Sequence, residues 1–178
     1  DDALIEKCQK ACHAIHNVPD FDSKQEIKWI WGQNFEESFP THHNHYLAED
    51  VEHSNYPLLC NHCEYPACVR VCPTKATFKR ESDGVVLMDF HRCIGCRYCM
   101  AGCPYGARSF NFQDPRNGIE KIDPLYPTRT RGVVEKCSFC YHRYQLARDR
   151  AFAEGRRDVE EDEYQTACTQ ACPAEAIT

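Results

Sequence analysis

The chain lacks any long hydrophobic run. Hydrophobic amino acids make up 42% of its 178 residues, but they occur in short groups such as residues 85–88. No stretch approaches the roughly 20 apolar residues of a transmembrane helix. We therefore predict no membrane-spanning segment in this chain, and any link to a membrane must pass through a partner.

A basic stripe is also missing. The chain has 21 Lys and Arg against 27 Asp and Glu, which gives a formal net charge of −6, and its basic residues are scattered. Proteins that bind nucleic acid carry a basic patch or stripe, because phosphate contacts dominate their affinity. Nucleic acid is therefore excluded as a partner.

The sequence contains no motif of a common catalytic site. We find no phosphate-binding loop, no dinucleotide-binding fingerprint and no nucleophile paired with its base. The chain is therefore expected to have no substrate site of its own and not to be an enzyme by itself.

Cysteine, by contrast, is abundant, with fourteen residues. The apolar residues are few for this length, so cysteine chemistry is expected to help hold the interior together. A disulfide framework, zinc sites and iron–sulfur clusters could each use these residues. A cluster needs four thiolates, several of them from one short loop, so the spacing separates the three chemistries.

One run has the spacing C-x2-C-x2-C-x3-C-P of bacterial ferredoxins. Its residues are Cys93, Cys96, Cys99, Cys103 and Pro104. A second run has two more residues in the loop and consists of Cys60, Cys63, Cys68 and Cys72. Partial runs flank these two and contain Cys8, Cys12, Cys137, Cys140, Cys168 and Cys172. A zinc ribbon would need neither the third cysteine nor the terminal Cys-Pro, so the spacing favours iron–sulfur clusters.

An internal repeat indicates the fold. The motif C-P-x-x-A begins at Cys72, Cys103 and Cys172, and a short β-prone stretch follows each copy. Each unit is predicted to contain a strand, a cluster loop, a short helix and a second strand, because proline ends the helix. One such strand is expected at residues 84–89, and an amphipathic helix is expected at residues 143–157.

We therefore predict an α+β fold of tandem bacterial-ferredoxin-like units with pseudo-twofold symmetry. It should have small sheets, short helices and long cluster-binding loops. The central two-cluster unit is expected to span residues 55–115. The second unit is expected to form from the two ends of the chain, residues 1–54 and 116–178.

The ligand sets follow from the exchange seen in two-cluster ferredoxins, where the fourth cysteine of a run serves the other cluster. The first predicted [4Fe–4S] site comprises Cys60, Cys63, Cys68 and Cys103. The second comprises Cys72, Cys93, Cys96 and Cys99. The third comprises Cys12, Cys137, Cys140 and Cys168. The sequence thus predicts three clusters.

A fourth cluster is left open. Cys8 and Cys172 supply half of its ligands, and strict spacing would put the others at Asp2 and Ile5. Either this run is stretched and its first cysteines lie upstream, or the site is lost. We expect that the ends of the chain are trimmed.

Several other residues have two interpretations. His62 could donate a hydrogen bond to a cluster sulfur or lie in an exposed loop. Arginines beside the cysteines could raise reduction potentials or be ordinary surface charges; they are Arg70, Arg92, Arg97 and Arg108. The aromatic stretch 29–39, with Trp29 and Trp31, could pack over a sheet, yet it is also our candidate docking surface. A solvated loop is favoured over metal or haem binding for His42, His43 and His45.

The four runs in this order resemble the four-cluster, ferredoxin-like electron-transfer subunits of membrane-bound respiratory oxidoreductases. Such subunits occur in dimethyl sulfoxide, polysulfide and formate enzymes. The likeness is closest to the DsrO subunits of DsrMKJOP complexes of sulfate and sulfur metabolisers. It rests on residues 11–19, 27–31, 91–100 and 103–112.

The resemblance implies a relay that carries electrons between a polytopic, quinone-interacting membrane subunit and other redox partners in sulfur or sulfate metabolism. A multihaem cytochrome is a further implied neighbour. The resemblance also implies export by a twin-arginine signal and a peripheral place on the periplasmic, extracytoplasmic face of the membrane. The alternative is the electron-transfer subunit of a molybdopterin oxidoreductase. A zinc-stabilised interaction module is a remote alternative.

Overall fold

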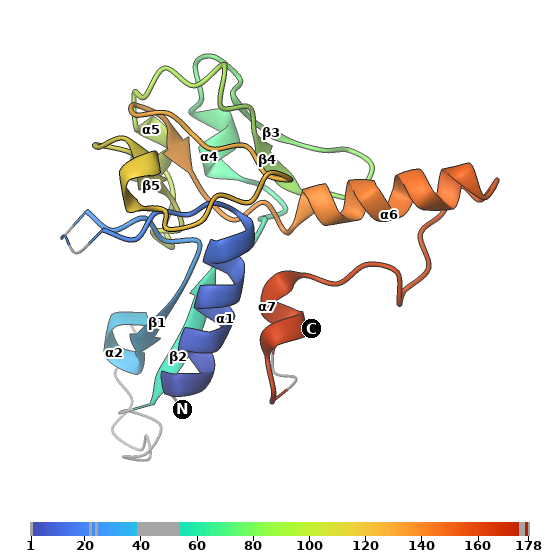
Figure 1. Cartoon of the computed structure of the whole chain (residues 1–178). Coiled ribbons are helices and arrows are strands. Elements are labelled where there is room, and N and C mark those ends of the chain that lie inside the picture. The colour runs from blue at the N-terminus through green and yellow to red at the C-terminus, as the bar shows by residue number, and fades with distance from the viewer. Residues whose placement is uncertain (1, 22, 24, 39–53, 175–176, 178) are drawn as a thin grey trace.

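The computed structural model describes residues 2–21, 23, 25–38, 54–174 and 177. Within them the chain forms three antiparallel two-stranded sheets and several helices, most of them short (Figure 1). This arrangement agrees with the predicted α+β class. In the described part of the chain, no helix combines the length and apolar character required to cross a membrane.

The central part of the chain contains the predicted strand and helix elements. The sheet elements are β3 (Thr77–Lys79) and β4 (Val86–Met88), and the helices are α4 (Ala67–Arg70) and α5 (Tyr98–Ala101). Phe78 pairs with Leu87 in the antiparallel register, and Gly84 has a positive φ of 72° in the connecting turn. The strand predicted at 84–89 is therefore confirmed, with its ladder limited to residues 86–88.

A second small sheet joins the centre of the chain to the later loop. It pairs β5 (Ser109–Phe110) with β6 (Val134–Glu135). Between these strands the chain runs through a short 3₁₀ helix, η1 (Pro115–Gly118), and a long loop. The sheet is short, so side-chain contacts must hold the long loop in place.

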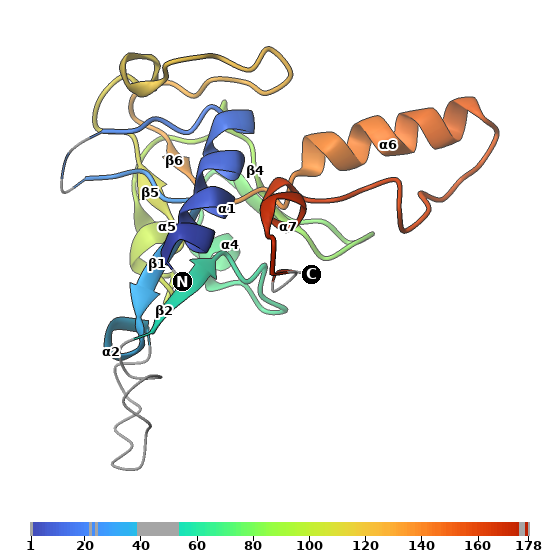
Figure 2. The same cartoon turned by 60° about the horizontal axis from the view of Figure 1, so that its bottom comes forward.

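The two ends of the chain pack against each other. The first helix, α1 (Asp2–Ile15), contacts α7 (Ala167–Ala171) and β1 (Ile30–Asn34). β1 pairs with β2 (Asn55–Leu59), and α2 (Phe35–Ser38) follows β1. In both views α7 lies beside α1, although they are more than 150 residues apart in sequence (Figures 1 and 2).

The core between these elements contains cysteines as well as apolar side chains. Cys8, Cys12, Ile27, Val18, Ile30, Trp29, Tyr126, Cys168 and Cys172 form one buried cluster. Trp29 is 1% exposed and Trp31 is 7% exposed. The prediction that residues 29–39 form a docking surface is therefore wrong for both tryptophans. Their large rings are buried in packing, which was the other interpretation of this stretch. Phe39 and the histidines His42, His43 and His45 lie outside the described residues.

The helix α6 (Tyr141–Ala153) extends outward from the body in both views (Figures 1 and 2). It confirms the helix predicted at 143–157, but it ends earlier because Gly155 adopts a φ of 80°. Ala147 and Ala151 are buried on one side, whereas Phe152 is 76% exposed. Leu146 is exposed as well, so the predicted apolar face is buried only at its two alanines, and the helix links the loop at Cys140 to the return of the chain.

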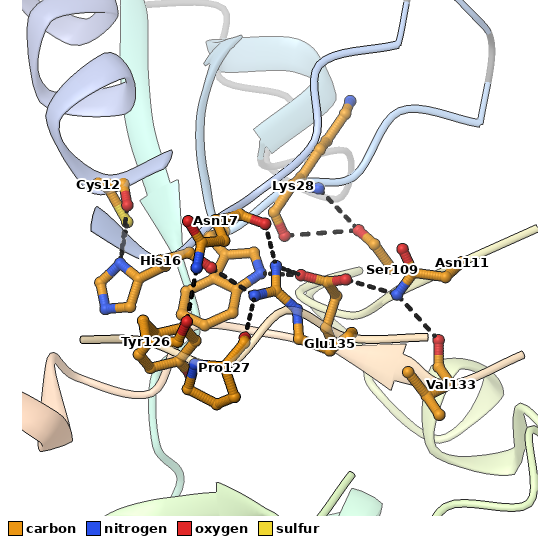
Figure 3. Close-up of polar contacts among 12 residues, drawn as sticks. Cys12, His16, Asn17, Lys28, Ser109, Asn111, Tyr126, Pro127, Val133 and Glu135 are labelled. Atoms are coloured by element: carbon orange, nitrogen blue, oxygen red, sulfur yellow. Dashed lines mark hydrogen bonds and ion pairs between the residues drawn. The ribbon is translucent and has the colours of Figure 1, made fainter. Parts of the chain in front are cut away.

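A buried polar network fixes the start of the chain to the second small sheet (Figure 3). The side chains of Arg129 and Glu135 form an ion pair that is fully buried. Arg129 donates hydrogen bonds to the carbonyls of His16 and Asn17, and Trp29 Nε1 donates to Glu135 Oε2 at 2.8 Å. Because buried charges require paired and hydrogen-bonded partners, this network holds the segment after α1 in one position.

Candidate iron–sulfur sites

Site A is a cavity lined by Cys60, Cys63, Cys68 and Cys103. The first two residues lie in the loop after β2, the third lies in α4, and the fourth follows α5. Because α4 packs against α5, each helix carries the cysteine behind it towards the other loop. Site A thus combines three cysteines of the second run with the last cysteine of the third.

Site B is a similar cavity lined by Cys72, Cys93, Cys96 and Cys99. Cys72 follows α4, whereas the other three belong to the loop and helix after β4. Sites A and B are both small, partly open cavities, so they are alike in size as well as in composition. The structure therefore brings together the cysteines of the first two predicted ligand sets.

The loop of site B depends on a glycine. Gly95 has a φ of 69°, and a Cβ at this position would lie 2.3 Å from the Gly132 carbonyl oxygen. Only glycine avoids that overlap, so it lets the cluster loop approach the segment before β6. There the Val134 N–H donates to Cys93 Sγ at 3.5 Å. The backbone thus supplies a hydrogen bond to a predicted ligand.

Site C is a cavity lined by Cys12, Cys137, Cys140 and Cys168. Phe139 and Cys140 adopt positive φ values of 56° and 49°, which turn the chain sharply before α6. The Phe139 N–H donates to Cys137 Sγ, and the Ala167 N–H donates to Cys140 Sγ, both at 3.3 Å. Residues from α1, the start of α6 and α7 therefore meet at one place, and they are those of the third predicted set.

The remaining two cysteines form half a site. Cys8 and Cys172 are buried, and their thiols hydrogen-bond to each other. Asp2 accepts a hydrogen bond from Asn55 at 2.6 Å, and Ile5 is half-buried on the same helix. Within the described residues, therefore, these positions complete no set of four cysteines.

Burial makes the thiols of site C reluctant to ionise. It raises the pKa of Cys140 to about 11 and that of Cys137 to about 12, and it raises the pKa of Cys12 well above its usual value. Neighbouring sulfurs add to this effect, because several negative charges would share one cavity. A metal that binds there must displace these protons, since cysteine ligates as its thiolate.

Cys72 behaves differently. Burial opposes ionisation of its thiol, but hydrogen bonds from the Thr77, Thr74 and Ala76 backbone and from the Thr74 hydroxyl together lower its pKa. These groups lie at the end of the C-P-x-x-A motif, so this repeat supplies donors to the sulfur. Sites A, B and C therefore fit [4Fe–4S] clusters in donor chemistry, with four cysteines each and backbone donors at several sulfurs.

The structure also decides between the interpretations of nearby basic residues. Arg108 is 4% exposed and lines site A, so it is not an ordinary surface charge. Arg70 and Arg92 are exposed, as expected for surface charges, whereas Arg97 is exposed but also lines site B.

His62 lines site A and is half-buried, so the exposed-loop interpretation is wrong. Its Nδ1 accepts a hydrogen bond from the Val86 N–H at 3.0 Å, and its Nε2 is buried with no partner among the described residues. Burial, with help from Lys136 and Arg108, lowers the pKa of His62 to about 3. The ring is therefore neutral and carries its proton on Nε2.

Lys136 was missed by sequence reasoning. It is 3% exposed and has Cys60, Cys137 and Cys68 as electrostatic neighbours. Its position directly before Cys137 was visible in the sequence, but no spacing rule indicates that a lysine will be buried.

The positions of the cysteines also bear on the two other chemistries considered for them, disulfide bonds and zinc sites. All fourteen cysteines are free thiols, which contradicts a disulfide framework. Among the residues that the structure describes, no three His, Cys, Asp or Glu are gathered closely enough to hold a single metal ion.

Comparison with known proteins gives one family and many relatives. The family model described as "4Fe-4S dicluster domain" matches residues 51–178. The chain is 45% identical over 175 residues to the "Hdr-like menaquinol oxidoreductase iron-sulfur subunit 1" of Archaeoglobus fulgidus, a match that covers 97% of this chain and 58% of the relative.

Two further relatives extend this range. The "menaquinone reductase, iron-sulfur cluster-binding subunit" of Nitratidesulfovibrio vulgaris is 44% identical over 96% of this chain and 68% of its own length. A subunit of the anaerobic dimethyl sulfoxide reductase of Escherichia coli is 33% identical over 96% of this chain and 64% of its own length. The chain thus spans between 58 and 68% of the length of these relatives.

Proposed function

The chain belongs to the 4Fe-4S dicluster domain family, and from that premise we propose that it relays electrons through sites A, B and C. It carries several [4Fe–4S] clusters and, like its relatives, is an iron–sulfur electron-transfer subunit and not a catalytic subunit. Each cluster takes up and returns a single electron. The chain's own residues would hold the clusters and set their separation.

One observation carries the proposal: three cavities are each lined by four cysteines that come from separate parts of the sequence. We assign one cluster to each cavity, with those cysteines as ligands. Exchange of Cys72 and Cys103 between sites A and B would give the pseudo-twofold relation predicted from the repeat. The corresponding division is residues 55–115 and the two ends, 1–54 with 116–178. Cys8 and Cys172 would supply half of a fourth site.

The sites have a natural order. Cys99 of site B has Cys68 of site A among its electrostatic neighbours, and Cys137 of site C has Cys60 of site A. Site A therefore lies between sites B and C. Electrons would pass from B to A to C, or in the reverse direction, because transfer requires adjacent sites.

The proposed partner is a polytopic, quinone-interacting membrane subunit. Support comes from two relatives that are named for menaquinol and menaquinone and that are 45 and 44% identical to this chain. The finer assignment is a DsrMKJOP-type complex of sulfur or sulfate metabolism, with a multihaem cytochrome as neighbour and a peripheral place on the periplasmic face. It is supported by the resemblance of residues 11–19 and 91–100.

A second candidate is the electron-transfer subunit of a molybdopterin oxidoreductase. The similarity to a dimethyl sulfoxide reductase subunit favours it. That identity is 33%, against 45% for the menaquinol oxidoreductase subunit, so we place it second.

Iron and sulfide analysis of the anaerobically prepared protein tests the cluster assignment. Three filled sites give about twelve irons per chain, and a fourth would give about sixteen. The protein should be brown, with broad absorption near about 400 nm, as expected of cysteine-ligated clusters. Eight or fewer irons in protein that has lost no cluster, or a colourless protein rich in zinc, would overturn the proposal.

A further inference from the structure

Two buried basic side chains lie where the proposed sites meet. Lys136 lies between sites A and C: its Nζ donates to the Val86 carbonyl, and to the Cys137 carbonyl at 2.6 Å. Burial and nearby Arg108 lower the pKa of Lys136, whereas Cys60 of site A and Cys137 of site C favour its charged ammonium form. One ammonium group therefore faces the ligands of two sites.

Arg108 occupies the other junction. It lines site A, and its guanidinium hydrogen-bonds the thiol of Cys99 in site B. Nη1 also donates to Thr77 Oγ1 at 3.2 Å and to Met88 Sδ at 3.3 Å, and both residues line site B. Its Nη2 is buried and has no hydrogen-bond partner among the described residues.

Neither cation has an acidic partner. Among the described residues, no Asp or Glu forms an ion pair with Lys136 or Arg108. An unpaired buried charge is costly, so the counter-charge must come from elsewhere. The sulfur ligands are the anionic groups next to both side chains, and a cluster held by four thiolates carries a net negative charge that increases on reduction.

We propose that Lys136 and Arg108 are positioning residues that raise the reduction potentials of the two sites each one joins. Lys136 acts on sites A and C, and Arg108 acts on sites A and B. The proposal rests on the proposed cluster sites. One electron moves between neighbouring sites, so one is oxidised as the next is reduced, and no bond or proton changes place.

The physical reason is electrostatic. A buried cation stabilises the extra negative charge of a reduced site more strongly than it would in water, because the local dielectric constant is low. Site A lies next to both cations, so it gains from both. The two cations therefore offset the repulsion between an electron on site A and the negative charge of sites B and C.

The test removes each charge separately. Lys136→Gln should lower the reduction equilibrium constants of sites A and C by about tenfold, which is about 59 mV for a one-electron couple. Site B should stay unchanged. Arg108→Gln should lower those of sites A and B and leave site C unchanged. Each cluster is followed by a redox titration monitored by electron paramagnetic resonance on the full chain in its complex.

Three control variants separate charge from structure. Lys136→Arg and Arg108→Lys keep the charge and should keep the wild-type potentials. Arg70→Met removes an exposed cation between Cys68 of site A and Cys72 of site B, where solvent screens the charge, and should shift no potential measurably. Lys136→Met and Arg108→Met provide a second neutral pair in case glutamine disturbs the packing.

Iron analysis of every variant keeps the two proposals apart. A wild-type chain without clusters would contradict the proposed function. Fully loaded neutral variants with unchanged potentials, or with equal shifts at all three sites, would overturn the role of the two cations. A third outcome would also overturn this role. If both neutral variants of Lys136, or both of Arg108, lose iron while the charge-conserving variant keeps it, that residue is needed to hold the clusters and is structural.

Discussion

At the scale of single residues, the buried polar network of Asn17, Arg129 and Glu135 has a structural role. Asn17 donates to the carbonyls of Asp123 and Tyr126 and accepts from the Asp123 N–H at 2.6 Å. The buried pair of Arg129 and Glu135 continues this network to β6. Through these bonds the loop at residues 123–135 is attached to the segment that follows Cys12 of site C.

Glu135→Gln should destabilise the protein strongly. It leaves the Arg129 guanidinium buried without its counter-charge, and breaking one partner of a buried pair costs about 3–5 kcal/mol. The change should lower the urea midpoint of unfolding of the cluster-loaded protein. Glu120→Gln, at an exposed position between β5 and β6, should leave the midpoint nearly unchanged. Equal midpoints for the two variants would show that the ion pair contributes little.

At the scale of elements, two very short helices determine how the cysteines are distributed. α4 and α5 contain four residues each, and they pack against each other. Each begins near the third cysteine of its run and ends before the fourth. The fourth cysteine is therefore carried away from its own loop, and Cys-Pro prevents the helix from continuing.

Cys72→Ala should damage site B and spare site A. The reason is that Cys72 lines the cavity of Cys93, Cys96 and Cys99 and not that of its own run. About four irons of twelve should be lost or converted, and the resonance signal that disappears should be the one lost with Cys93→Ala. Cys103→Ala is the matched control, because it should damage site A and spare site B. If Cys72→Ala removes the same signal as Cys60→Ala, the proposed exchange is wrong.

At the scale of the whole molecule, the three proposed sites lie in a row. Site A is central, site B lies on one side of it, and site C lies where the two ends of the chain meet. A carrier that diffuses needs one or two clusters, whereas a fixed relay needs a row of them, because electron tunnelling falls steeply with distance. The formal charge of −6 and the negative charge of bound clusters favour local and partly apolar docking surfaces.

The whole molecule should therefore behave as part of a membrane complex. Membranes solubilised gently should yield the chain together with a multi-span, quinone-interacting subunit. Native gel migration followed by identification of the co-migrating subunits measures this. Washing with high salt before detergent provides the control for loosely adsorbed protein. Recovery of the entire chain as a free, redox-competent monomer at every detergent strength would contradict the proposal.

Much of the architecture could be predicted because its signals are local. The runs ending in Cys-Pro, the short strand at 84–89 and the helix after Cys140 are encoded by neighbouring residues, and the structure contains these elements. The α+β class followed from the repeated C-P-x-x-A motif. Spacing also indicated the chemistry, since three cysteines on one loop suit a cluster better than a single ion.

Other features depended on contacts between distant parts of the chain, which local patterns do not encode. Trp29 was a candidate for a docking surface until the fold placed it against Glu135 and Tyr126. Arg108 could have been a surface charge, and nothing marked Lys136 at all. Their burial arises where β4, β6 and the cluster loops meet. The sequence by itself determined which residues could hold iron and how the local elements form, because those depend on short-range spacing. Only the tertiary structure decided which cysteines share a cavity and which cations lie between cavities, because both depend on the packing of segments far apart in the chain.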